Sequence, residues 1–306
     1  MRRAVGLIFV LASLLAAQRP ATGGYPGAFT RFGSNARDVA LAGALVADVN
    51  GGFLAFTNPA SVVRVQRREL GMSYLALPLG RSIQSLGIAL RLPPGAAVAI
   101  SYLRAADESI QGRNSIGEKT GLLSYAEQAV GLTFSNRLTE RISFGLMAKL
   151  LLSSLAGESS QGFAIDVGLL YWRPSGLSLG LRAENVTGAY AWRILVADGN
   201  REYSERLPRL LSAGLRIPAR HFTFFAQVDA LFPEQGGVVN TFRAGLEDRV
   251  TEQAVVRFGL NHLTPTGGVG LLFSVREPRD SRVDYTLSLG KAGEGWGHLF
   301  SWLFRL

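Results

Sequence analysis

Residues 285–306 read YTLSLGKAGEGWGHLFSWLFRL and contain two runs in which apolar and polar residues alternate. The second run ends at the last residue of the chain, and one of its two phases holds His298, Phe300, Trp302, Phe304 and Leu306. A period of two predicts a β-strand whose side chains point alternately to opposite faces. An aromatic face on such a strand favours contact with lipid, because aromatic residues form girdles around barrels of the outer membrane.

The first residues of the chain have the pattern of a secretory signal. Two arginines precede an apolar run from Ala4 to Ala17, and small residues follow between Ala17 and Gly24. About fourteen apolar residues are too few for a membrane-spanning helix, which needs about 20. We therefore expect a signal peptide over residues 1–23 that is cleaved after it has directed export to the outer membrane.

The composition favours a β-rich chain and argues against several kinds of site. The 306 residues include 36 glycines and only three methionines, and 47% of them are hydrophobic. With no cysteine and three histidines, the sequence predicts no metal site and no cofactor. The net charge of +9 fits contact with an anionic lipid surface; the basic residues form no run of five or more, and we expect no nucleic-acid partner.

From Val63 onward the alternating pattern repeats with little interruption, and it predicts an even number of strands. We expect fourteen, at residues 69–77, 82–92, 96–104, 125–134, 141–152, 162–172, 177–185, 209–217, 221–231, 239–247, 253–262, 268–276, 282–290 and 296–306. Short turns alternate with longer links, and the two longest links are residues 105–124 and 186–208. This alternation is typical of outer-membrane barrels. Residues 63–306 are therefore predicted to form an all-β, about 14-stranded antiparallel transmembrane β-barrel; a soluble exported β-protein that binds ligands is the alternative.

The phase of each strand predicts which side chains face lipid and which face the lumen. Phe163 and Val167 share one face of their strand, and Asp166 and Gly168 share the other. The same phase places twelve charged residues in the lumen: Arg91, Glu127, Lys149, Asp166, Arg182, Glu184, Arg216, Asp229, Arg243, Glu247, Arg257 and Asp284. Because a buried unpaired ion costs several kcal/mol, we expect Lys149 to pair with Asp166 and Asp229 with Arg243.

The lumen charges balance, so the excess positive charge is expected in the loops and turns. The basic residues there include Arg113, Lys119, Arg193, Arg201, Arg206 and Lys291. The phase also predicts which residues contact lipid, and this can be tested by substitution. Val167 and Phe273 are predicted to face lipid near mid-strand, where arginine should be far less tolerated than at Gly168 if the lumen has space for it there.

Residues 24–62 break the alternation and are predicted to form a plug or hatch segment. The small residues from Ala36 to Gly43 suggest a short helix or turn that packs closely against its surroundings. The segment ends in Asn58-Pro59-Ala60, where proline fixes the backbone and biases Asn58 away from helix. We expect a rigid corner that starts the barrel; a movable gate is the alternative.

This segment resembles the N-terminal motif of the PorV/PorQ group of outer-membrane proteins, relatives of the FadL-type long-chain fatty acid transporters. The residues that carry the resemblance in the predicted plug are Ser34, Arg37, the small run around Gly43, Asp48, Asn58, Pro59 and Ala60. Residues 162–170 and 179–185 resemble strands of the same group. The resemblance implies a fourteen-stranded barrel whose N-terminal segment folds into or beneath the lumen.

No motif of an enzyme is present, so we expect a non-enzymatic membrane component with no catalytic residue. The resemblance implies a part in protein secretion, with outer-membrane lipids, secretion-system proteins or exported substrates as partners. The alternative is a FadL-like transporter that moves hydrophobic or small solutes through a plugged barrel, with a hydrophobic ligand. An apolar interior near the plug would favour transport, whereas a filled lumen with long outer loops would favour docking of protein partners.

Overall fold

The computed structural model describes residues 24–50, 54–66, 68–196, 199–262, 264–275, 280–289 and 294–306. The predicted signal peptide at residues 1–23 and Lys291 lie outside these ranges. Among the residues described, no helix combines the length and apolar character that a bilayer crossing requires.

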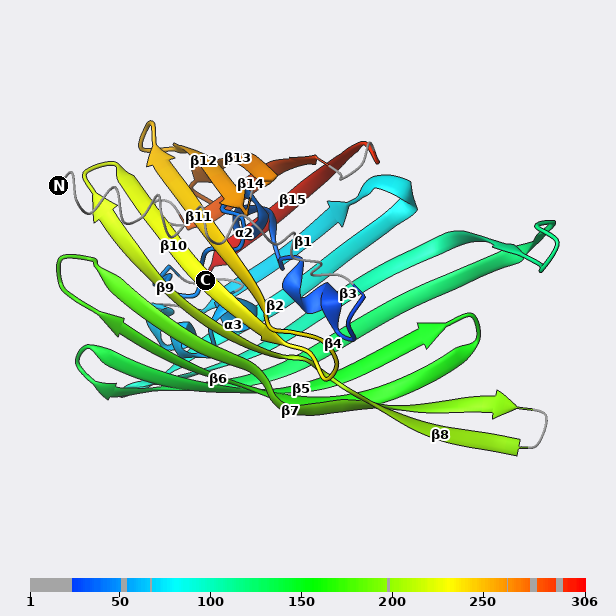
Figure 1. The fold of residues 1–306 in the computed structure, drawn as a ribbon. Coiled ribbons are helices and arrows are strands. Elements are labelled where there is room, and N and C mark those ends of the chain that lie inside the picture. Colours follow the sequence, from blue (N-terminus) through cyan, green and yellow to red (C-terminus); the bar gives the residue numbers. More distant parts are fainter. Residues whose placement is uncertain are drawn as a thin grey trace.

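The chain forms a closed antiparallel barrel of fourteen strands (Figure 1). The strands are β1 (Glu69–Ala76), β2 (Arg81–Leu92), β3 (Ala96–Arg113), β4 (Lys119–Thr139), β5 (Ile142–Leu155), β6 (Glu158–Trp172), β7 (Ser178–Val196), β9 (Arg209–Ala219), β10 (Phe222–Phe232), β11 (Val239–Arg249), β12 (Ala254–Asn261), β13 (Thr264–Phe273), β14 (Ser281–Leu289) and β15 (Trp296–Arg305). Closure comes from the pairing of β1 with β15. The predicted fold class is confirmed.

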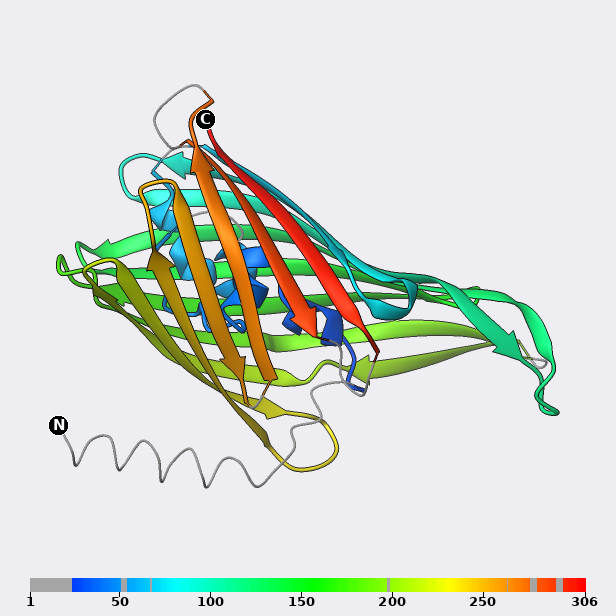
Figure 2. The ribbon, with the colours of Figure 1, turned by 90° about the horizontal axis from the view of Figure 1, so that it is seen from above.

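A further strand, β8 (Gly199–Arg206), pairs only with β7 and is not part of the closed wall. Two links predicted as long loops are in fact hairpins, because β3 continues to Arg113 before β4 begins and β7 continues to Val196 before β8. Figure 2 shows both hairpins projecting from the same end of the barrel. The prediction failed because hydrogen-bonded pairing continues beyond the membrane, where no face is buried and the apolar alternation is lost.

Burial alternates along the wall as the sequence phase predicted. In β6, Ala164, Asp166, Gly168 and Leu170 are buried, whereas Phe163 is 53% exposed on the outside. Since the outer face is largely apolar and the inner face carries the charges, the barrel has the polarity of a protein surrounded by lipid.

The N-terminal segment lies inside the barrel (Figure 1). It contains two short 3-10 helices, η1 (Ala28–Arg31) and η2 (Pro59–Arg64), and two short α-helices, α2 (Ala36–Ala40) and α3 (Leu54–Thr57). Helix α2 starts where the side chain of Asn35 accepts a hydrogen bond from the Asp38 backbone N–H at 3.0 Å. Another 3-10 helix, η3 (Pro78–Gly80), connects β1 and β2 at the hairpin end. We refer to residues 24–62 as the plug.

Candidate functional site

The plug follows the inner wall of the barrel and is held there by hydroxyl groups of the strands. Each of these hydroxyls donates to a plug carbonyl: Thr286 to Ala36 at 2.6 Å, Thr266 to Ala40 at 3.1 Å, Ser178 to Ala47 at 2.6 Å, and Ser135 and Ser143 to Ala60 at 3.1 and 2.8 Å. The contacts run from β14 through β13 and β7 to β4 and β5. The plug backbone therefore crosses much of the circumference before the chain enters β1.

Six glycines make this close approach possible. They occur as three directly paired couples on neighbouring strands: Gly145 with Gly168, Gly180 with Gly214, and Gly245 with Gly259. A Cβ atom on Gly180 would lie 2.7 Å from the Cα of Ala47, and one on Gly259 would lie 2.6 Å from the carbonyl oxygen of Ala40. At Gly145, Gly180 and Gly259 a Cβ atom would overlap the plug backbone, whereas at Gly245 the nearest plug atoms would lie 3.1 to 3.2 Å away and would have to move by only a few tenths of an ångström. We call these six residues the glycine belt.

Asn58 contacts the glycine belt at Gly168 and lies in the last part of the plug, shortly before the first strand of the barrel. Its amide nitrogen donates to the carbonyl oxygen of Val46 at 2.7 Å, and its Oδ1 accepts from the backbone N–H of Ala60 at 3.0 Å. The side chain is fully buried beside Gly168. Both functions of the amide are used, which fits a rigid corner at Asn58-Pro59-Ala60.

Charged side chains of the plug and of the wall form an alternating chain of ion pairs that we call the ion ladder. Its members in order are Asp48, Arg37, Glu247, Arg257, Asp284 and Arg282, joined by N···O distances of 2.5, 2.8, 2.7, 2.8 and 2.7 Å. Arg216 approaches the Asp48 end at 3.5 Å. Because two members come from the plug and four from β11, β12 and β14, the ladder ties the plug electrostatically to the wall.

A second charged group surrounds Lys149 of β5. Its ammonium lies 2.8 Å from Asp166 and 3.4 Å from Glu184, and Glu184 also pairs with Arg182 at 2.5 Å. Thr30 of the plug donates to Glu184 at 2.8 Å. The pair of Asp229 with Arg243 also forms, at 2.8 Å. Both ion pairs expected from the sequence are therefore confirmed.

The remaining predicted residues are placed as follows. Ser34 lies at the start of α2, where its carbonyl accepts from Ser73 of β1 at 2.7 Å, and Gly43 packs against the guanidinium of Arg243. Glu127 lies apart from the other lumen charges, where it accepts hydrogen bonds from Tyr125 and Tyr190. Arg91 keeps the inward phase but is exposed at the end of β2, so it belongs to the rim rather than to the buried lumen.

Inside the barrel, apolar side chains gather from the level of Lys149 toward the hairpin end, with the buried carboxylate of Glu127 beside them. Phe29 and Phe56 of the plug pack there against inward-facing side chains of the wall, which include Leu75, Leu103, Met147, Leu151 and Leu299. We call this set the apolar cluster. Sequence analysis missed it because only the charged members of the inward phase were taken as lumen residues. The signal was present in β5, where Met147 and Leu151 share the phase of Lys149.

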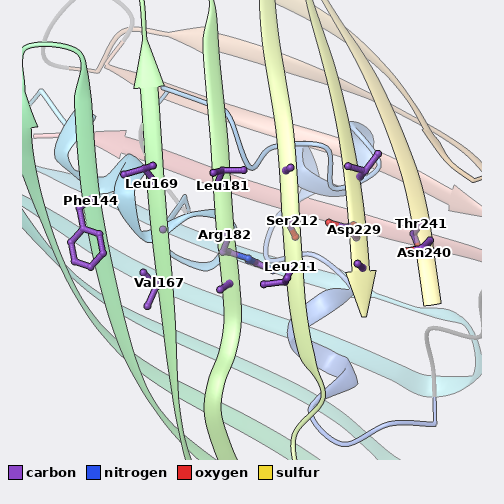
Figure 3. A pocket seen from close by; sticks show the side chains of 15 residues that line it. Phe144, Val167, Leu169, Leu181, Arg182, Leu211, Ser212, Asp229, Asn240 and Thr241 are labelled. Carbon is purple, nitrogen blue, oxygen red and sulfur yellow. The ribbon is translucent and has the colours of Figure 1, made fainter. Parts of the chain in front are cut away.

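A hollow of about 730 Å³ lies on the lipid-facing side of the wall. It crosses β5, β6, β7, β9, β10 and β11, and its outward-facing lining includes Val167, Leu169, Leu181, Leu211 and Val228 (Figure 3). Since this face is apolar, hydrocarbon chains would fill the hollow in a bilayer. A much smaller polar pocket of about 30 Å³ lies at the plug beside Arg182, Asp229 and Arg243.

Comparison with known proteins relates the chain to others by fold alone. No protein family matches the sequence, and no curated protein does. Among solved structures, the CymD monoaromatic hydrocarbon channel superposes with a TM-score of 0.68 at 15% identity, over 90% of this chain and 98% of that one. The Pseudomonas putida toluene transporter TodX superposes with a TM-score of 0.67 at 12% sequence identity, over 90% of this chain and 98% of that one. A Pseudomonas aeruginosa FadL homologue superposes with a TM-score of 0.59 at 10% sequence identity, over 89% of this chain and 98% of that one.

These matches show that the chain has a barrel fold of the kind found in the two hydrocarbon channels and the FadL homologue. The FadL side of the predicted resemblance is therefore supported at the level of the fold. The more specific resemblance to the PorV/PorQ group remains a prediction.

Proposed function

We propose that the protein is a non-enzymatic outer-membrane transporter that admits small hydrophobic compounds through its plugged barrel. The observation that carries the proposal is the apolar cluster, in which plug residues pack against inward-facing apolar side chains of the wall inside the barrel. An apolar interior beside the plug is the feature expected of hydrophobic transport rather than of a water-filled pore. Similarity of fold to a toluene transporter and to a monoaromatic hydrocarbon channel adds support.

In this proposal the short-turn end faces the periplasm and the hairpin end faces outward, as in other barrels of the outer membrane. A hydrophobic solute enters among the apolar cluster, whereas ions and sugars are excluded because nothing there would replace their hydration. The plug then has to shift or rearrange before the solute leaves. The signal peptide at residues 1–23 would bring the chain to this membrane and be removed.

Uptake by vesicles provides the test. Proteoliposomes with the full chain should accumulate labelled toluene or another alkylbenzene faster than empty vesicles, and should admit a sugar of similar size no faster than empty ones. Equal acceleration for both solutes would indicate an open pore and contradict the proposal. Absence of any acceleration would contradict it as well.

The plug offers a second test, because the chain contains no cysteine of its own. A Cβ atom on Gly245 would lie 3.2 Å from the Cβ of Leu41, a few tenths of an ångström below the range of about 3.5–4.5 Å that is typical of disulfides, so a small shift of the plug would allow the bond. The double change Leu41→Cys and Gly245→Cys should therefore cross-link the plug to β11. If the plug moves during transport, uptake is lost on oxidation and returns on reduction. The single change Leu41→Cys is the matched control, and it should respond to neither treatment.

Protein secretion is the second candidate, and one observation favours it. The β3–β4 and β7–β8 hairpins project beyond the rim (Figure 2) and offer exposed side chains such as Ile116 and Tyr203 for docking. Pulldown of the natural complex from outer membranes would test this function. Recovery of secretion proteins that depends on the hairpins would support it over transport.

A further inference from the structure

Exposed charges differ between the two ends of the barrel. At the hairpin end, basic residues have acidic partners nearby: Arg81 with Glu294 at 2.6 Å, Arg206 with Glu234 at 3.6 Å and Arg193 with Glu202 at 3.8 Å. Excess positive charge was expected in loops and turns together, and in the loops of this end the acids offset much of it.

The short-turn end is unbalanced. Among the described residues of this rim, seven arginines are exposed, namely Arg68, Arg91, Arg137, Arg141, Arg173, Arg220 and Arg249. The exposed acidic residues of the same part of the chain are Glu140 and Glu252. Among the described residues, exposed positive charge is therefore concentrated where the short turns meet the membrane surface. A surface of this kind attracts anions over a distance of about 10 Å.

Two of these arginines converge on one outward-facing tyrosine. Tyr171 is the second-last residue of β6 and has the phase of the lipid-facing residues Phe163 and Leu169. The Nε of Arg173 donates to its hydroxyl at 3.1 Å, and Arg141 in the neighbouring turn is held next to it, because the Arg141 carbonyl accepts from the backbone N–H of Trp172 at 3.0 Å. In the part of the chain that the structure describes, no carboxylate lies within ion-pair distance of either guanidinium.

The position of this trio relative to the apolar band indicates what it meets. Tyr171 is paired in register with Leu179 of β7, which is 47% exposed on the outer face. The guanidiniums thus lie at the level where hydrocarbon contact ends and lipid headgroups begin. Arginine binds phosphate with two parallel N–H donors, and a tyrosine hydroxyl supplies a further donor when its own oxygen is already contacted by arginine.

We propose that Arg141, Arg173 and Tyr171 form a binding site for the headgroup phosphate of an anionic phospholipid in the adjacent leaflet. The headgroup accepts hydrogen bonds from the two guanidiniums while its acyl chains lie against the outer wall above Leu179. The remaining rim arginines contribute long-range attraction. The site depends on insertion of the barrel in a bilayer but not on transport.

Native mass spectrometry of the full chain in neutral detergent tests the site, with phosphatidylglycerol as probe and phosphatidylcholine as reference. The natural chain should retain phosphatidylglycerol in preference to phosphatidylcholine, and a higher salt concentration should weaken that preference. The double change Arg141→Gln and Arg173→Gln should weaken binding of phosphatidylglycerol about tenfold, given the attraction that each basic residue has for an anionic membrane surface. Heat-modifiable gel migration verifies that the variant barrel is folded.

The matched control is Arg193→Gln with Arg201→Gln, which removes the same charge from the β7–β8 hairpin and should leave lipid retention unchanged. Equal retention of the two lipids by the natural chain would overturn the proposal, as would equal losses in both double variants. Preferential capture of an acidic protein by the rim, without preference for phosphatidylglycerol, would also overturn it. Alkylbenzene uptake should be the same in the rim variant, so failure of this site and failure of the transport proposal are distinguishable.

Discussion

The inner and outer faces of one barrel wall obey different rules, although their residues alternate along the same strands. On the outside, Phe163 and Leu181 are more than half exposed and touch few protein atoms. On the inside, Gly168 and Gly180 have no side chain, yet they contact the plug backbone. The outer face needs only to be apolar, because lipid adapts to its shape. The inner face needs a particular side chain at each position, because the plug does not adapt.

Polar groups show the same contrast. Inside, Arg257 is 1% exposed and pairs with two carboxylates, so each charge has a fixed partner. Outside, Arg173 lies at the rim where water and headgroups are available. The contrast predicts that changes inside depend on the partners of the residue, whereas changes outside depend on depth in the membrane. Four substitution pairs test this, with the free energy of unfolding in vesicles followed by tryptophan fluorescence as the common measurement.

The largest effect is expected for Arg257→Met. This change leaves Glu247 and Asp284 without their shared partner in the ion ladder, and loss of one member of a buried pair costs about 3–5 kcal/mol. Arg249→Met, at the exposed end of β11, should change the free energy of unfolding by less than about 0.5 kcal/mol. Comparable losses in both variants would show that the ladder contributes little.

Val167→Arg should cost about 2–4 kcal/mol, because Val167 faces lipid near the middle of β6. Phe273→Arg is the control for depth. Phe273 was predicted near mid-strand, but β13 ends at this residue, so arginine can reach the headgroups and should cost about 0–1 kcal/mol there. Equal costs at the two positions would contradict the assignment of depth.

Gly268→Val and Gly267→Val compare the two faces at adjacent residues of β13. A Cβ at Gly268 would lie 2.7 Å from the carbonyl oxygen of Tyr285 and 2.8 Å from the Cβ of Ala40 in the plug. Overpacking of this kind costs about 1–3 kcal/mol. At Gly267 the nearest atom would be 3.6 Å away, and valine should be tolerated or slightly stabilising. A greater loss at Gly267 would reverse the assignment of faces.

The smallest effect concerns single hydroxyls on β5. Ser143→Ala removes a donor to the carbonyl of Ala60 and should cost about 1 kcal/mol. Ser154→Ala, on the outward phase of the same strand, should fall within about 0.5 kcal/mol of the natural chain. If the two variants are equally stable, the hydroxyl contacts add little beyond the packing of the plug.

One expectation from the sequence needs correction in the light of these contacts. Gly168 was expected to accept arginine more readily than Val167, on the assumption that the lumen offers space. A Cβ at Gly168 would already lie 3.0 Å from the backbone nitrogen of Ala60 and closer still to Asn58. Arginine is therefore not expected to fit there. The sequence indicates which face is polar, but it does not show whether that face is filled.

Ion pairs illustrate where sequence reasoning succeeded and where it stopped. Lys149 with Asp166 and Asp229 with Arg243 were predictable because their strands are consecutive and their phases agree. Arg37 with Glu247 was not, since 210 residues separate them and the plug has no periodicity that sets its register against β11. For the same reason, the sequence did not show that the glycine belt lets the plug backbone approach the wall.

The sequence by itself determined the fourteen wall strands, their phase and the closed barrel, although not the projecting hairpins, because alternation along a strand is a local property that lipid on one side and polar groups on the other impose on each strand separately. Only the tertiary structure decided how the plug is held, which glycines it requires and where the rim arginines converge. Those contacts join segments that are distant along the chain, and their geometry exists only after the barrel has closed around the plug.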